Sequence, residues 1–241
     1  MLSDMSERLK EQLLPLYEKL ALINPHLEYE TFCAQWGEAY KEGGIMFVGR
    51  AVNDWKAQGD RDTEGLFTLG SPNQIFMCDD QVKWVETERY DKKSAFWRVV
   101  KSVSQQITND KEGWYKHIVW SNLYKLSPTG GGNPGSVLRE AQYKTCLDIL
   151  KVELEVFKPK FVVFLNGLVW YASFICDLSG YDEYGTPNLN SVDEKFLNDS
   201  SYKAYVHKIG ETYFICSEHP QGKPEKEHAD VIVEMIKKFS M

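Results

Sequence analysis

The chain has 241 residues, of which 43% are hydrophobic and 26% charged, a balance that is ordinary for a soluble globular protein. Its formal net charge of −7 excludes a surface that attracts nucleic acid as a whole, so a polyanion would need a local basic patch. The five cysteines show no CxxC pair and no metal-like spacing, which predicts reduced thiols and no metal site or other cofactor.

The first elements are predicted from helical spacing. Leucines recur at that spacing through residues 3–22, and Pro25 ends this amphipathic helix. A short second helix is predicted over 31–40, which makes 1–42 an N-terminal helical segment. The continuous apolar run 45–49 that follows is typical of a strand buried on both faces.

The middle of the chain begins with a long segment without clear periodicity, residues 50–89, rich in Asp, Gly, Asn and Thr. Long loops inside compact domains are usually functional. A helical pattern returns at 92–107, and a second strand is predicted at 118–123. It leads into a flexible connection, 125–134, that contains three consecutive glycines.

The last part of the chain alternates helical and strand patterns. The polar, turn-rich segment 180–201 interrupts this alternation and is predicted to be an insertion. The predicted helices are 136–157, 168–178 and 225–239, and the predicted strands are 161–165 and a hairpin of 202–209 with 212–216. Alternating helices and apolar strands predict one α/β domain with a mostly parallel sheet.

Polar residues follow three of these strands directly. The first strand leads into Gly49-Arg50-Ala51, the second contains Asn122, and the last leads into Ser217-Glu218-His219-Pro220. Because the carboxyl ends of parallel strands meet at one edge of a sheet, we expect these residues to converge. His219 at the end of a buried strand is the central candidate, with a satisfied turn histidine as the alternative.

In this order of motifs the chain resembles the uracil-DNA glycosylase superfamily. A glycine-containing loop follows the first strand, an asparagine lies in the second and a His-Pro loop follows the last. The middle is similar to the iron–sulphur branch of that family, and the matching residues are Asn122, Lys125, Pro128, Asn133-Pro134, Cys146 and Lys158-Pro159-Lys160 through Gly167. The match spans roughly residues 43–240 in order, although each motif alone is short.

The resemblance implies a single domain over 1–241, a three-layer α/β/α sandwich around a central, mostly parallel four-stranded sheet. It also implies a hydrolase that cleaves the N-glycosidic bond of a flipped deaminated or damaged base in single- or double-stranded DNA. Such a protein is expected to be a cytoplasmic monomer. The apolar stretch of a signal peptide or membrane span is absent from the sequence, so no contact with a membrane is predicted.

The resemblance also implies roles for individual residues. Asn122 would read the edge of the base, and His219 would donate a hydrogen bond to a base oxygen as negative charge develops there. Phe67 is the candidate stacking ring, with a core anchor as the alternative. The remaining predicted substrate-binding residues are Gly49, Arg50, Ala51, Ser127, Gly222 and Lys223, and the glycines 130–132 are predicted either to bind backbone phosphates or to form a flexible loop.

The first motif departs from the family pattern. The better-known branches carry a carboxylate and a proline in this loop, where the chain has Arg50, Ala51 and Val52. Asp54 is the nearby candidate for the missing acid, although an aspartate that forms a turn is the alternative. Arg50 suits a phosphate or carboxylate better than activation of water. Of the cysteines that hold the cluster in the iron–sulphur branch, only Cys146 has a counterpart, so no cluster is expected.

Three functions therefore compete. The first is a glycosylase-like hydrolase, and the second is a catalytically impaired fold relative that binds a nucleotide or nucleic acid. The third is an α/β hydrolase of small molecules unrelated to DNA. A positive groove beside His219, formed by Arg50, Lys125, Lys223 and Lys226, would argue against the third.

Overall fold

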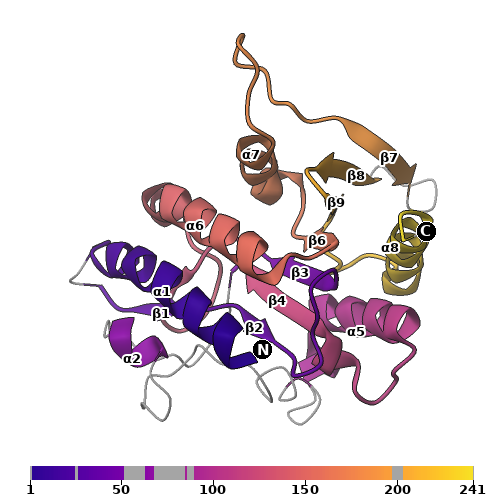
Figure 1. Ribbon diagram of the computed structural model, residues 1–241, viewed down its shortest axis with the longest axis horizontal. Coiled ribbons are helices and arrows are strands. Elements are labelled where there is room, and N and C mark those ends of the chain that lie inside the picture. Colours follow the sequence, from indigo (N-terminus) through magenta and orange to yellow (C-terminus); the bar gives the residue numbers. More distant parts are fainter. Residues whose placement is uncertain are drawn as a thin grey trace. The chain divides into compact units, whose positions relative to one another are not determined.

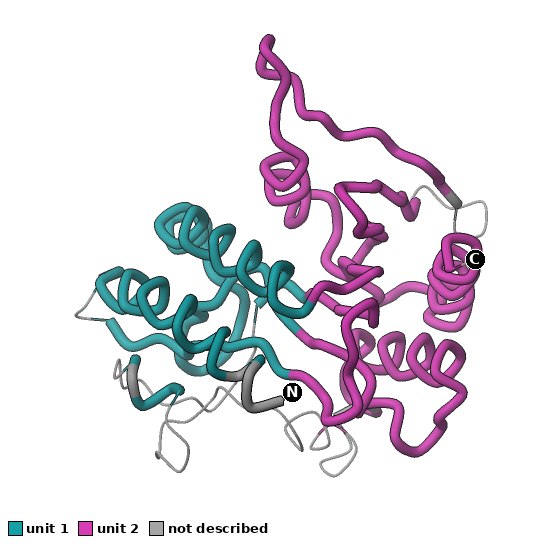
Figure 2. The backbone as a smooth tube through the Cα atoms, viewed as in Figure 1, with its two compact units in different colours: residues 1–35, 49–78, 121–157 teal, residues 36–48, 79–120, 158–241 magenta. Residues whose placement is uncertain are grey.

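The structure is a computed structural model that describes residues 2–24, 27–51, 63–67, 85, 90–196 and 203–240 (Figure 1). The chain is a mixed α/β protein and divides into two compact units, coloured separately in Figure 2. Unit 1 comprises residues 1–35, 49–78 and 121–157, and unit 2 comprises residues 36–48, 79–120 and 158–241. Each unit is assembled from three separate segments of the chain.

Unit 1 is built on two long helices, α1 (Leu2–Ala21) and α6 (Ser136–Phe157), which pack against each other. Both helices are confirmed as the sequence predicts them. The apolar stripe of α1 is buried at Leu9, Leu13, Tyr17 and Leu20, which is the spacing of one helix face. The remaining elements of unit 1 are β1 (Tyr29–Thr31), α2 (Thr63–Phe67) and β5 (Leu126–Pro128), and β1 pairs antiparallel with β5.

The predicted helix over 31–40 is wrong. This part of the chain forms β1 and the two-residue strand β2 (Gln35–Trp36), so α1 is the only helix among the described residues of 1–42. Every side chain from Phe32 to Trp36 is fully buried, whereas a surface helix would expose one face. The backbone instead finds partners across strands, because the N–H of Phe32 donates to the carbonyl of Lys125 and the N–H of Gly37 donates to that of Ile118.

The larger sheet has strands that lie wholly or mainly in unit 2. Among the described residues it has seven strands in the order β2-β4-β3-β6-β9-β8-β7. The pairs β3–β6 and β6–β9 are parallel, and β9–β8 and β8–β7 are antiparallel. The bounds of these strands are β3 (Ile45–Gly49), β4 (Ile118–Asn122), β6 (Phe161–Leu165), β7 (Ser191–Phe196), β8 (Lys203–Ile209) and β9 (Thr212–Ser217).

The sheet therefore differs from the predicted four strands. The strands predicted from continuous apolar runs are β4, β3, β6 and β9, which are neighbours in the sheet, and the predicted hairpin of β8 and β9 is confirmed. The segment 180–201, predicted as an insertion, contributes the edge strand β7. Its sequence, Ser-Val-Asp-Glu-Lys-Phe, lacks the continuous apolar run of a central strand because an edge strand is only partly covered.

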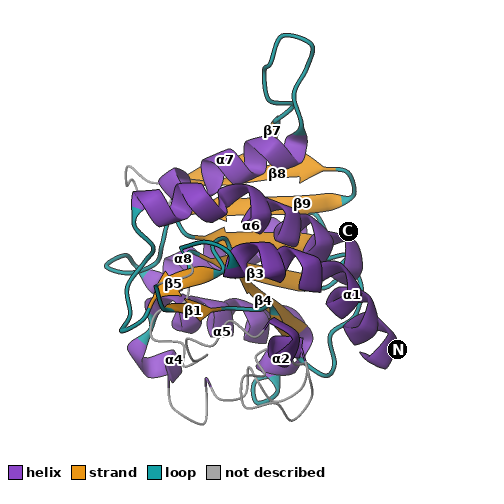
Figure 3. Ribbon diagram, turned by 90° about the vertical axis from the view of Figure 1, so that its left-hand side faces the viewer, coloured by secondary structure: helices purple, strands orange, loops and turns teal. Residues whose placement is uncertain are grey.

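The helices of unit 2 are α4 (Tyr90–Lys93), α5 (Ala95–Thr108), η1 (Trp114–His117), α7 (Leu168–Ser179) and α8 (Glu225–Lys238). The helix predicted over 92–107 is interrupted at Ser94, whose hydroxyl caps α5 by accepting the N–H of Trp97 at 3.4 Å. In unit 2, α5 packs against α8 and α7 packs against β9 (Figure 3). Within the described parts of the chain, no helix is long and apolar enough to cross a bilayer.

A loop projects from unit 2 between α7 and β7 (Figures 1 and 3). Its turn is organised by Asp182, whose Oδ1 accepts the N–H groups of Tyr184 and Thr186 at 2.9 and 2.8 Å. The side chain of Tyr184 is 84% exposed. The loop carries Asp182 and Glu183 and no Lys, Arg or His, so it is acidic.

Candidate functional site

The ends of the first and second predicted motifs run side by side in unit 1. The carbonyl oxygen of Gly49 accepts the N–H of Leu123 at 3.0 Å, and that of Arg50 accepts the N–H of Tyr124 at 3.0 Å. Gly49 is buried, and Arg50 and Ala51 are half-buried. The predicted proximity of these two motifs is therefore confirmed at the level of the backbone.

Asn122, the last residue of β4, is the most informative of the predicted site residues. Its side chain is 2% exposed, and its Nδ2 has no hydrogen-bond partner among the described residues. Leaving a buried donor unpaired costs about 1–3 kcal/mol, and such groups in native proteins call for an explanation. The Nδ2 of Asn122 therefore does not donate to a carbonyl of the described backbone.

The rest of this motif lies deeper than the sequence predicts. Ser127, in β5, is fully buried. Lys125 is also fully buried and forms an ion pair with Glu153, the two charged atoms being 2.7 Å apart. Lys125 therefore does not form part of the predicted positive groove, because its buried ammonium is paired with a carboxylate and cannot reach a phosphate.

Phe67, the candidate stacking ring, ends α2 in unit 1. Its side chain is 6% exposed, and its ring packs edge-on against Tyr17 with the centroids 5.4 Å apart. This packing favours the alternative of a core anchor. Asp54, the candidate for the missing acid, lies outside the described residues.

The His219 loop begins at the carboxyl edge of the sheet in unit 2. Parallel pairing sets Leu165 opposite Ser217, and the N–H of Gly167 donates to the carbonyl of Ser217 at 3.0 Å. On the other side of β6, the Nδ2 of Asn166 donates to the carbonyl of Val48 at 3.3 Å. The ends of β3, β6 and β9 therefore lie at one edge of the sheet, where ligands bind in α/β proteins.

Within this loop, the Nδ1 of His219 accepts the backbone N–H of Gln221 at 3.2 Å. Because Nδ1 is an acceptor, the proton of the neutral ring lies on Nε2, which makes Nε2 a donor. The half-buried His219 is followed by Gly222, whose φ of 73° favours glycine, and by Lys223, whose N–H donates to the carbonyl of Pro220. The loop is a tight turn.

A second histidine lies behind this loop, and the sequence does not reveal it. His228, in α8, is fully buried, and its Nε2 lies 2.6 Å from the Oγ of the buried Ser217. Burial, followed by the charges of Lys223 and His219, lowers the pKa of His228 to about 4. No local pattern links a strand-end serine to a helical histidine eleven residues later, so only the fold identifies the pair.

The surface of unit 1 beside β5 has a groove of about 660 Å³ lined by both apolar and polar side chains. Its lining residues include Leu27, Tyr29, Pro128, Val137 and Leu138. The connection that follows β5 contains Gly130, Gly131 and Gly132, whose φ values of 87°, 93° and 99° explain why three glycines occur together.

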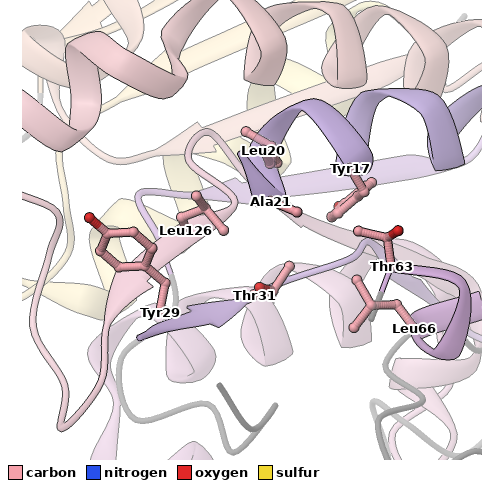
Figure 4. Close-up of a pocket in the computed structure, with 8 residues that line it drawn as sticks. All are labelled: Tyr17, Leu20, Ala21, Tyr29, Thr31, Thr63, Leu66 and Leu126. Atoms are coloured by element: carbon pink, nitrogen blue, oxygen red, sulfur yellow. The ribbon is translucent and has the colours of Figure 1, made fainter. Parts of the chain in front are cut away.

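A second, enclosed cavity of unit 1 is shown in Figure 4. It lies between α1, α2 and the β1–β5 pair, and the side chains that point into it include Tyr17, Leu20, Thr31 and Leu66. Its volume is about 10 Å³, which is room for a single water molecule. The cavity is therefore too small to hold a nucleobase.

Cys146, the one counterpart of the cluster cysteines, lies buried in α6. Its Sγ donates to the Oε1 of Gln142 at 3.3 Å, and burial raises the pKa of its thiol to about 12. A protonated thiol of this kind packs as a small apolar side chain. In the segments that the structure describes, no group of three His, Cys, Asp or Glu side chains is arranged to hold a metal ion.

Comparison with known proteins does not assign this chain to a family. No protein-family model matches this chain, and no curated protein sequence matches it significantly.

Proposed function

We propose that this protein is a uracil-DNA glycosylase-like hydrolase that cleaves the N-glycosidic bond of a flipped deaminated or damaged base in DNA. The observation that carries the proposal is the buried Nδ2 of Asn122, which has no partner among the described residues. A pyrimidine carbonyl oxygen would satisfy this donor. The proposal includes a three-layer α/β/α arrangement around the strands β4, β3, β6 and β9.

In this proposal Asn122 reads the edge of the base, and His219 acts on the base as it leaves. Breaking the glycosidic bond leaves the bonding electron pair on the base, and a hydrogen bond from the Nε2 of His219 would stabilise the resulting negative charge. The acceptor role of its Nδ1 supports this assignment, because it directs the ring proton to Nε2. Water then adds to the sugar carbon that the base has left, and the proton that this water loses neutralises the base anion. Arg50, Gly222 and Lys223 would bind the DNA backbone.

The alternative is a catalytically impaired relative that binds a nucleotide or nucleic acid. The sequence of the first motif favours it, because Arg50 and Ala51 occupy the positions of the family's carboxylate. A glycosylase without that carboxylate loses the group that positions or activates water. The amide of Asn122 serves either function, since base recognition precedes cleavage.

The two functions are separated by one assay. Single- and double-stranded oligonucleotides that contain uracil or another deaminated base are incubated with the protein and then treated with alkali, which cleaves abasic sites. Strand cleavage supports the hydrolase, and DNA binding at low salt without cleavage supports the impaired relative. If neither cleavage nor binding is found, both are excluded, and a small-molecule hydrolase becomes the leading function.

Matched variants show whether the proposed residues act. Asn122→Ala and His219→Ala should each lower the rate by about 100-fold or more, since each removes a donor aimed at the base. Asn188→Ala and His117→Ala are the controls, because Asn188 is exposed in the projecting loop and His117 pairs with Asp110 on the surface. Equal rates for test and control variants would contradict the assignment.

A further inference from the structure

Three buried polar side chains form a closed cluster directly beside Asn122. The Nζ of Lys125 donates to the Oε1 of Glu153 and to the Oγ of Ser121, both at 2.7 Å. The Oγ of Ser121 donates to the Oε2 of Glu153, also at 2.7 Å. All three side chains are fully buried, and the ammonium also lies 5.6 Å from the centre of the Phe32 ring.

The same helix holds the backbone that follows Asn122. The Oε1 of Gln142 accepts the N–H groups of Lys125 and Leu126, and its Nε2 donates to the carbonyl of Leu126 at 3.0 Å. Gln142 and Glu153 both belong to α6. This helix therefore binds residues 121–126 at two places, through Glu153 to the side chains of Ser121 and Lys125 and through Gln142 to the backbone. Asn122 lies inside the held segment.

The cluster also determines which groups face α6. Successive side chains of a strand point to opposite faces, so Ser121 is directed to α6 and Asn122 to the other face. Within the cluster, the Oγ of Ser121 and both carboxylate oxygens of Glu153 are already hydrogen-bonded. The amide of Asn122 therefore lies on the face of β4 opposite the cluster.

Stability alone does not account for such a cluster. The desolvation of two buried charges offsets most of their attraction, and apolar side chains of similar volume often serve the fold as well or better. Lys125 lies between β4 and β5 and Glu153 lies in α6, so the pair joins α6 to this connection. A role in positioning explains why a costly pair lies next to an amide whose Nδ2 has no partner in the part of the chain that the structure describes.

We propose that the Lys125–Glu153 ion pair is a positioning device that holds Asn122 with its amide directed to a ligand. The inference rests on the proposed function, because it assigns the device to the same base-reading amide. Lys125 and Glu153 do not touch the base; they act through Ser121 and the backbone of residues 121–125. The pair would thus set how firmly the base is held.

The test separates positioning from stability with a double replacement. Lys125→Met and Glu153→Leu should each lower the melting temperature by roughly 10 °C, because each leaves one buried charge without its partner. The variant with both replacements should regain most of that loss. Its uracil excision rate should nevertheless stay at least about tenfold below that of the unchanged protein. Recovery of both stability and activity would overturn the inference.

The control is a pair of the same charges at the surface. Lys158 and Glu42 lie 3.1 Å apart with both side chains more than half exposed. Replacing both by Gln should change neither the melting temperature nor the activity appreciably, since surface pairs contribute about 0–1 kcal/mol.

A second measurement does not depend on activity. The side-chain NH₂ signals of Asn122 in the ¹⁵N NMR spectrum are assigned by their loss in Asn122→Ala. In the double replacement of Lys125 and Glu153 these signals should shift and broaden, because the amide samples more than one orientation. If they stay unchanged, the positioning role is excluded. If they shift while the unchanged protein neither cleaves nor binds uracil-containing DNA, the proposed function fails and the positioning of Asn122 stands.

Discussion

Ser217 and His228 share a hydrogen bond of 2.6 Å between Oγ and Nε2, and both side chains are buried. Ser217 is the last residue of β9 and His228 lies in α8, so the bond closes the loop that carries His219. Burial and the nearby positive groups lower the pKa of His228 from its ordinary 6.5 to about 4, so the ring is neutral at pH 7. The loop is therefore closed by a bond to a histidine that is neutral at pH 7.

This histidine makes the stability of the protein depend on pH. In the unfolded chain His228 binds a proton below pH 6.5, and in the folded protein only near pH 4, so acid favours unfolding. The contribution of His228 to the free energy of unfolding is about 3 kcal/mol. It is complete above pH 6.5 and is lost as the pH falls toward 4. Unfolding by urea at a series of pH values measures this slope.

The matched variant for this prediction is His228→Gln, which cannot bind the proton. In this variant the free energy of unfolding should depend less steeply on pH between pH 6.5 and 4. His207, in β8, contributes in the same direction, because burial lowers its pKa as well. His207→Gln should therefore remove a further part of the slope. An unchanged slope in His228→Gln would show that His228 does not control the acid response.

Asn122 and Gln142 are two buried amides of unit 1 with opposite hydrogen bonding. Asn122→Ala removes a donor without a partner among the described residues, so the free energy of unfolding should change by less than about 1 kcal/mol. Gln142→Ala leaves two backbone N–H groups and one carbonyl unpaired and should cost about 3 kcal/mol or more. Denaturant unfolding measures both, and equal losses would mean that the amide of Asn122 is satisfied in the folded protein.

The role of Phe67, as a core anchor or as a ring that stacks on a base, can be tested with an apolar side chain that has no ring. Phe67→Leu should lower stability by about 1–2 kcal/mol, because the edge-on contact with Tyr17 is lost from a buried site. Activity on uracil-containing DNA should stay close to that of the unchanged protein. A rate at least about tenfold lower at nearly unchanged stability would instead assign Phe67 to base stacking.

The start of α8 is held to α5 by a two-pronged ion pair. The Nε and one terminal nitrogen of Arg98 donate to the two carboxylate oxygens of Glu225, each at 2.6 Å. These hydrogen bonds lower the pKa of Glu225, so the pair stabilises the fold above the ordinary pKa of 4.5 and ceases to do so as the pH falls below it. A double-mutant cycle with Arg98→Gln and Glu225→Gln should give a coupling of about 1 kcal/mol at pH 7 and none near pH 2.

The control for that cycle is the exposed pair of Lys226 and Asp230 in the same helix, which should give only about 0.3–0.5 kcal/mol. A coupling between Arg98 and Glu225 that is the same at both pH values would contradict the ionic origin of this contact.

The sequence predicts the helices and central strands well because their patterns are local. The heptad-like leucines of α1 and the apolar runs of β3, β6 and β9 each reflect burial of one element. The short strands β1 and β2 are not predictable in this way, since tertiary burial of Phe32 to Trp36 overrides a weak helical spacing.

In the candidate site too, local sequence signals are predictable and tertiary contacts are not. Asn122 and His219 are found from the sequence because polar residues at strand ends are a local signal. The ion pair of Lys125 with Glu153 joins residues 28 positions apart, and no pattern distinguishes a buried lysine from an exposed one. Lys125, predicted as part of a positive groove, is therefore a buried structural group, and only the packing of α6 reveals this.

The projecting loop of unit 2 has a consequence for the direction from which a nucleic acid can approach. The loop between α7 and β7 carries Asp182 and Glu183 and no Lys, Arg or His, and the turn around Asp182 exposes it. The carboxylates of Asp193 and Glu194, in β7, lie instead 3.1 and 4.0 Å from the ammonium groups of Lys238 and Lys203. The field of such a loop repels phosphates over about 8–10 Å at physiological salt. If the proposed function holds, a DNA strand is therefore steered away from Tyr184, and replacing Asp182 and Glu183 by Asn and Gln should speed its association.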